Sequence, residues 1–133
     1  MRASIHAATL LLILSACIGM ADQGIKITAP SDKSSVLERP IVEGTVADPN
    51  ASVWVIVHPL EVSDYWVQPS ITVRPDGAWK VQIYIGRPGN VDIGKRFEIR
   101  AVLNPHDQLS EGKILATWPK GAALSNVIEV TRK

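Results

Sequence analysis

Residues 71–85, ITVRPDGAWKVQIYI, carry the clearest structural signal in the chain. Apolar residues alternate with polar ones on both sides of a central Pro-Asp-Gly, and this period of two predicts β-strands with one buried face. Pro75 presets φ for a turn, and Asp76 and Gly77 tolerate the left-handed angles of a short reversal. The segment therefore predicts two strands joined by a tight turn, with Trp79 on the buried face.

The segment at residues 52–58, SVWVIVH, is apolar on both faces, which is typical of a central strand covered on both sides. Val53, Val55 and Val57 should face one way, and Trp54 and Ile56 the other. Shorter alternating segments predict further strands at residues 25–28, 40–46, 65–67, 97–103 and 127–131.

Gly44 falls inside one of these strands, at a position where a neighbour can approach the backbone closely. Residues 104–126 are broken by prolines and glycines and are expected to form a long loop. No helical period of useful length occurs. The pattern predicts an all-β fold, an immunoglobulin-like antiparallel β-sandwich of about seven strands over residues 22–133.

The overall charge argues against two classes of partner. The 133-residue chain has room for one domain, with 14 basic and 13 acidic residues. Loss of an N-terminal segment containing Arg2 would leave 13 of each, a neutral domain. We therefore expect no nucleic-acid partner, and no basic run suggests adsorption to anionic lipid.

Residues 1–21 read as an export signal, with Arg2 before an apolar run and small residues after it. Two cleavage positions compete. Cleavage after Ala16 would follow the lipobox-like Leu-Ser-Ala-Cys and leave Cys17 as the lipidated residue, whereas cleavage after Ala21 would leave a soluble domain. Both alternatives predict export to the periplasm or cell surface, with membrane attachment only through a lipid on Cys17. Cys17 is the only cysteine, so no intramolecular disulfide is expected.

Six short motifs resemble the bacterial immunoglobulin-like (Big-type) domain family found in surface and secreted proteins. They lie at residues Ile27–Pro30, Val42–Val46, Pro49–Val53, Asp76–Trp79, Gly94–Val102 and Ser125–Thr131. The resemblance covers nearly the whole predicted domain and implies a β-sandwich acting as a spacer or adhesive module. Here one domain carries its own export signal, and residues 59–66 and 106–120 look longer than a minimal member needs. These departures favour an interaction module over a spacer.

Patterns that would indicate catalysis are missing from the sequence. It contains no Gly-x-Ser-x-Gly, phosphate loop, Cys-x-x-Cys or His-Glu-x-x-His. His58 and His106 stand alone and are expected to pack or cap rather than act as bases. The aspartates in turns are expected to cap backbone groups rather than bind calcium, which needs six or more oxygens gathered together. The sequence predicts no catalytic residue, metal or cofactor.

Three aromatic residues next to turns are the candidate contact residues: Trp66 first, then Tyr65 and Trp118. Exposed rings could anchor an envelope protein or stack on a glycan, with Asp64, Gln68 and Pro69 as a polar, stiff rim beside Trp66. Alternatively, the rings close the open ends of the sandwich.

The expected topology separates these aromatic residues, because the loops that carry them should emerge at opposite ends. Tyr65 and Trp66 should then not share a platform with Trp118, unless residues 104–126 fold back along the sheet. The predicted function is a non-catalytic, exported or envelope-associated interaction module; the alternative is a carbohydrate-binding module. An exposed aromatic pair on one face would favour sugar, and an apolar patch or bare sheet edge a protein.

Overall fold

A computed structural model describes residues 24–133 of the chain. The predicted export signal and Cys17 lie outside these residues. The described part contains ten strands and no helix long and apolar enough to cross a membrane. In chain order the strands are β1 (Ile25–Ala29), β2 (Ser34–Val36), β3 (Ile41–Val46), β4 (Val53–Pro59), β5 (Tyr65–Val67), β6 (Ala78–Gln82), β7 (Arg96–Pro105), β8 (Ile114–Leu115), β9 (Gly121–Leu124) and β10 (Ile128–Arg132).

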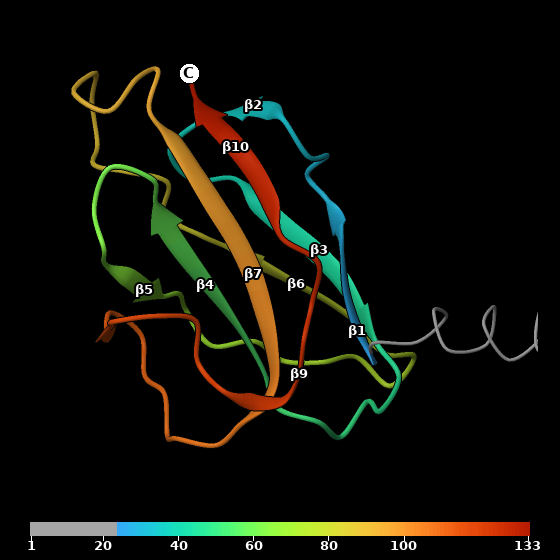
Figure 1. Cartoon of the computed structure of the whole chain (residues 1–133). Coiled ribbons are helices and arrows are strands. Elements are labelled where there is room, and N and C mark those ends of the chain that lie inside the picture. Colours follow the sequence, from blue (N-terminus) through green and yellow to red (C-terminus); the bar gives the residue numbers. More distant parts are fainter. Residues whose placement is uncertain (1–23) are drawn as a thin grey trace, which may run out of the picture.

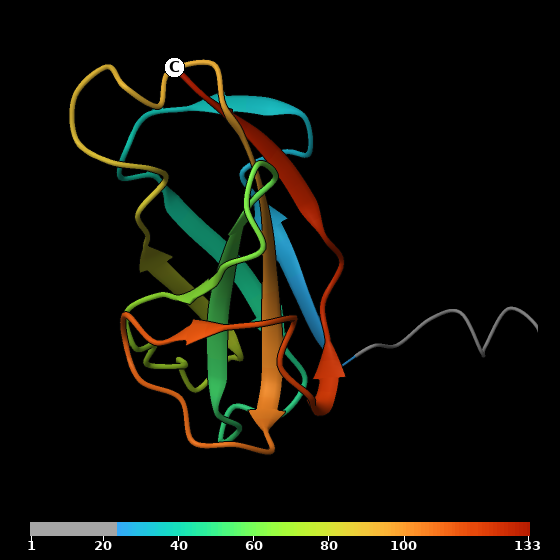
Figure 2. The same cartoon turned by 60° about the vertical axis from the view of Figure 1, so that its left-hand side comes forward.

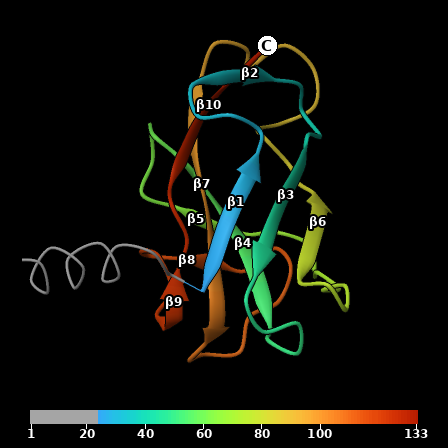
Figure 3. The same cartoon turned by 90° about the vertical axis from the view of Figure 1, so that its right-hand side faces the viewer.

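The strands form two sheets that pack face to face (Figures 1 and 3). The smaller sheet has the order β1-β3-β6. The larger has the order β2-β10-β7-β4-β5-β8, and β9 also pairs with β7. All of these pairings are antiparallel except that of β2 with β10. The predicted all-β sandwich is confirmed. Its strand count exceeds seven because β8 and β9 form in the segment that was expected to be a loop, and because β2 is a further short strand.

The main core lies between the two sheets, as the alternation predicts. Val53, Val55 and Val57 of β4 are all at most 2% exposed and face the smaller sheet. Trp79 is 2% exposed and belongs to the same core, which confirms its predicted place on the buried face. Burial of these side chains is the main source of stability in a domain of this size.

Residues 71–85 do not form the predicted hairpin. The turn is present: the amide of Gly77 donates to the carbonyl of Arg74 over 2.9 Å. However, β6 pairs with β3, and residues 71–73 form no strand. The amide of Gln68 still bonds to Val55 of the larger sheet, whereas that of Arg74 bonds to Ala78 of the smaller sheet. The residues between them cross from one sheet to the other, so they cannot stay in either ladder.

Residues 104–126 also differ from the predicted loop; we call them the outer strap. They fold back over the outer face of the larger sheet, where β8 pairs with β5 and β9 with β7 (Figure 2). A second apolar cluster fills the space beneath, and its buried members are Ile56, Val67, Val102 and Leu109. The outer strap thus supplies the second cover that the two-faced apolar pattern of β4 requires.

Candidate binding cleft

A cleft of about 490 Å³ opens at one side of the sandwich. One wall comes from the end of β4, the loop after it and β5, and the other from residues 84–97. Residues 111–112 of the outer strap complete the lining. The buried side chains of Val57 and Phe97 reach it from the main core, and exposed Val62 lies at its edge. The cleft is therefore apolar inside, with aromatic and charged side chains around it, a composition common in ligand sites.

Trp66 lines this cleft because of the register between β4 and β5. It pairs with Val57, so both side chains lie on the face of the larger sheet that looks toward the smaller one. Val57 is 2% exposed, but Trp66 is 38% exposed. The three-stranded sheet thus covers Val57 but does not extend over Trp66. The indole ring is left as an open wall of the cleft.

Tyr84 forms part of the opposite wall and is 47% exposed. It points outward because Ile83 and Ile85, its neighbours in the alternating segment, are fully buried. The guanidinium of Arg39 lies 3.8 Å from the centroid of its ring, a cation–π contact that steadies the ring.

Buried Gln68 ties the two aromatic walls together. Its side-chain oxygen accepts a hydrogen bond from the amide of Tyr84 over 2.8 Å, and its side-chain nitrogen donates to the carbonyl of Trp66 over 3.3 Å. The residue predicted as an exposed rim is therefore a brace, only 4% exposed. Because the brace connects backbone atoms of both walls, the spacing of Trp66 and Tyr84 is set within the fold.

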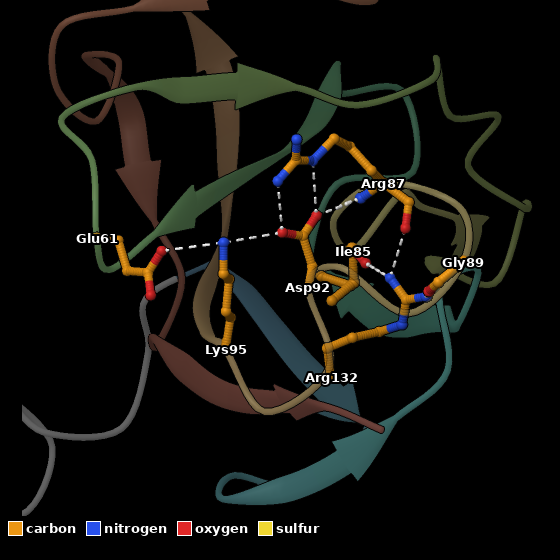
Figure 4. A network of polar contacts seen from close by, with 7 residues as sticks. All are labelled: Glu61, Ile85, Arg87, Gly89, Asp92, Lys95 and Arg132. Carbon is orange, nitrogen blue, oxygen red and sulfur yellow. Dashed lines mark hydrogen bonds and ion pairs between the residues drawn. The ribbon is translucent and has the colours of Figure 1, made fainter.

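The polar end of the cleft is a network around Asp92 (Figure 4). The Asp92 carboxylate accepts hydrogen bonds from the Arg87 side chain at 3.1 and 3.2 Å and from the Arg87 amide at 2.7 Å. Lys95 lies 3.0 Å from Asp92 and 3.3 Å from Glu61. The Arg87 side chain, its amide and Lys95 hold the pKa of Asp92 well below its usual range. Asp92 in turn raises the pKa of both Arg87 and Lys95.

Arg132 holds the loop that carries this network. Its guanidinium donates to the carbonyls of Ile85 and Arg87, each over 2.9 Å, and to that of Gly89 over 2.6 Å (Figure 4). Arg132 is 4% exposed, and its buried charge is stabilised by these backbone oxygens. The loop at residues 86–94 is fixed by this contact, so the polar end of the cleft is formed before any ligand arrives.

The other two candidate contact residues, Tyr65 and Trp118, lie together on the opposite face of the larger sheet. Their ring centroids are 4.8 Å apart in an edge-to-face arrangement, and Tyr65 also stacks on His58 at 4.0 Å. The expectation that they emerge at opposite ends is wrong, because the outer strap folds back and brings Trp118 beside β5. Trp66 projects from the other face of β5, so the three rings do not form one platform.

The polar residues in strands and turns mostly behave as expected. Nε2 of His58 donates to the carbonyl of Val62 over 2.8 Å, and Nδ1 lies 3.2 Å from the Glu98 carboxylate, so this histidine packs and caps. Asp48 and Asp76 each accept a bond from the backbone amide two residues later, at 2.9 and 3.0 Å. Within residues 24–133, no three His, Cys, Asp or Glu side chains gather where they could hold a metal ion.

Several residues of the cleft were not singled out from the sequence. Tyr84 could have been found, because it is an aromatic residue at an outward position of an alternating segment. The charged residues could not be found in this way, since they come from separate loops that only the folded chain brings together. They are Glu61, Arg87, Lys95 and Glu111.

No protein-family model matches this chain, and comparison with curated proteins gives no match either. The resemblance to bacterial immunoglobulin-like domains stays a prediction from sequence motifs.

Proposed function

We propose that this protein is an exported, envelope-associated interaction module that acts without catalysis and binds its partner in the cleft beside Trp66. The observation that carries the proposal is a braced cleft of about 490 Å³ whose walls include the exposed rings of Trp66 and Tyr84. Large exposed aromatic residues in a concave site are the usual anchors of binding. The place of action comes from the export pattern in residues 1–21.

Binding is favoured over catalysis by the state of the charged groups. A general acid or base works best when its pKa lies near the working pH. The pKa of Asp92, the most buried carboxyl group of the cleft, is instead lowered by Arg87 and Lys95. This arrangement keeps Asp92 ionised and paired, which suits a structural role in a binding site.

The test compares capture of envelope components by the wild-type protein and by Trp66→Ala. We expect the substitution to weaken capture by roughly 1–3 kcal/mol, a factor of about 5 to 150, because the ring is a binding wall. The melting temperature should change little, since the ring is already 38% exposed. Ile41→Ala is the matched control: this side chain is 52% exposed on β3 and does not line the cleft. Unchanged capture by Trp66→Ala would overturn the proposal.

A carbohydrate-binding module is the second candidate function. The presence of two exposed rings in one cleft favours it, because sugar rings stack on aromatic side chains. Binding of soluble glycans, measured for wild type, Trp66→Ala and Tyr84→Ala, tests this candidate. Both variants should bind a glycan ligand more weakly than wild type. Failure of every glycan to bind would remove this candidate function.

A further inference from the structure

The cleft is lined by more carboxylates than cations, and only some of these groups have ion-pair partners. Two cations and four carboxylates give a net charge of 2 − 4 = −2; these residues are Arg87, Lys95, Glu61, Asp64, Asp92 and Glu111. The cations gather at one end of the cleft, in the network around Asp92 (Figure 4). This network is neutral when Glu61 is included, so the excess negative charge of the lining lies on Asp64 and Glu111.

Both cations are already paired with carboxylates of the cleft. Arg87 makes two side-chain bonds to Asp92, and Lys95 contacts both Asp92 and Glu61. The Asp92 side chain is only 7% exposed, so displacing it would leave a buried carboxylate without its partners. This cost is large for a buried charge. Phosphate, carboxylate or acidic glycans would therefore compete with Asp92 and Glu61 for these two cations.

Two carboxylates that line the cleft with Trp66, those of Asp64 and Glu111, do not belong to this network. Asp64 precedes Trp66 by two residues. Glu111 adjoins Gly112, whose amide donates to the carbonyl of Val67 over 2.9 Å, so Glu111 also lies beside β5. Within the described part of the chain, neither carboxylate has an ion-pair partner. An exposed indole that lines the same cleft as two unpaired carboxylates attracts a cation through both the ring face and the charges.

We propose that the cleft receives a lysine or arginine side chain of a partner protein, presented next to aliphatic residues. The cationic group lies at Trp66, with Asp64 and Glu111 as counter-ions, and the aliphatic residues fill the apolar interior at Val57 and Phe97. Charge complementarity selects this occupant over a neutral glycan, which could use the ring but would leave both carboxylates uncompensated. The proposal rests on the proposed function and specifies the chemistry of its partner.

The experiment uses three blocked peptides as probes: N-acetyl-Leu-Arg-Leu-amide, its citrulline isostere and its glutamate counterpart. Binding to isotope-labelled protein, processed as the host exports it, is followed by NMR at the indole N–H of Trp66, which is assigned from Trp66→Phe. We expect a saturable shift with the arginine peptide below about 10 mM, and binding about 5-fold weaker or more with citrulline. The glutamate peptide should not bind, and added salt should weaken the arginine peptide.

Variants test whether Asp64 and Glu111 cause the preference for the cationic peptide. Asp64→Asn with Glu111→Gln should bring the affinity for the arginine peptide close to that for the citrulline peptide. Glu43→Gln, an exposed acidic position on β3 outside the cleft, should leave it unchanged. Equal binding of the arginine and citrulline peptides would overturn the cationic partner, as would no shift up to about 10 mM. A shift with N-acetylglucosamine oligomers but not with arginine would also overturn it.

The proposed function has a separate readout. Loss of native capture in Trp66→Ala supports a binding cleft whatever the peptides show. Failure of the peptides alone therefore removes the cationic partner and leaves the interaction module in place, whereas unchanged native capture removes the module itself.

Discussion

The indole ring of Trp79 lies directly over the backbone of Gly44 on the neighbouring strand. The two residues are paired in the register of β3 and β6. A Cβ atom at Gly44 would overlap both the ring of Trp79 and the carbonyl oxygen of Lys26. Only glycine leaves room for the largest side chain of the main core at this point. The close approach expected at Gly44 is therefore real, and the neighbour that causes it is Trp79.

Gly44→Ala should destabilise the domain by about 3 kcal/mol, because the extra methyl group has no space and the Lys26 carbonyl belongs to a fixed ladder. Denaturant unfolding measures the change. Thr45→Ala, at the next and exposed position of β3, is the control and should cost much less. A midpoint for Gly44→Ala equal to that of the control would show that the ring of Trp79 lies elsewhere.

Trp118→Ala should lower the free energy of unfolding by about 2 kcal/mol, since the ring packs on Tyr65 and on the cluster beneath the outer strap. The full cost of removing a buried tryptophan is not expected, because Trp118 is only half-buried. Thermal or denaturant unfolding of this variant beside Trp66→Ala is the measurement. If Trp66→Ala proved the more destabilising of the two, the assignment of Trp66 to the cleft and Trp118 to the packing would be wrong.

Asp92→Asn should cost about 2 kcal/mol at neutral pH, because it removes the charge from a carboxylate bonded to Arg87 and Lys95. The pKa of Asp92 is lowered in the folded protein, so its ionised form stabilises the fold at pH values above its unfolded pKa of about 4. This contribution is lost as the pH falls below that value. The difference in free energy of unfolding between wild type and variant should therefore be largest at neutral pH and decrease progressively below about pH 4. A gap that widens in acid would contradict this role.

The mature protein should lack residues 1–16 or 1–21, as the order of charged, apolar and small residues at the N-terminus predicts. The intact mass of protein recovered from the envelope distinguishes the two. An added diacyl mass on a chain that starts at Cys17 would identify a lipoprotein, whereas a chain that starts at Asp22 would be soluble. Recovery of a chain that still begins at Met1 would refute the export signal.

Local patterns in the sequence determined most of the strands and the faces that they bury. The alternation in β6 and β7 depends only on the pleat of an extended chain, so it could be read without knowing any partner strand. The turn before β6 and the capping roles of Asp48 and Asp76 are equally local, because each joins atoms within a few residues.

Only the tertiary structure decided which strands pair and where the aromatic residues lie. The segment at residues 71–73 alternates like a strand, yet it crosses between sheets, because its two ends bond to different ladders. The outer strap contains few strand signals, but β8 and β9 pair because β5 and β7 offer open backbone groups beside it. The face that Trp66 presents follows from its register with Val57, and the cleft combines loops about 50 residues apart in sequence. Such contacts depend on how distant segments meet in space, which no local period encodes.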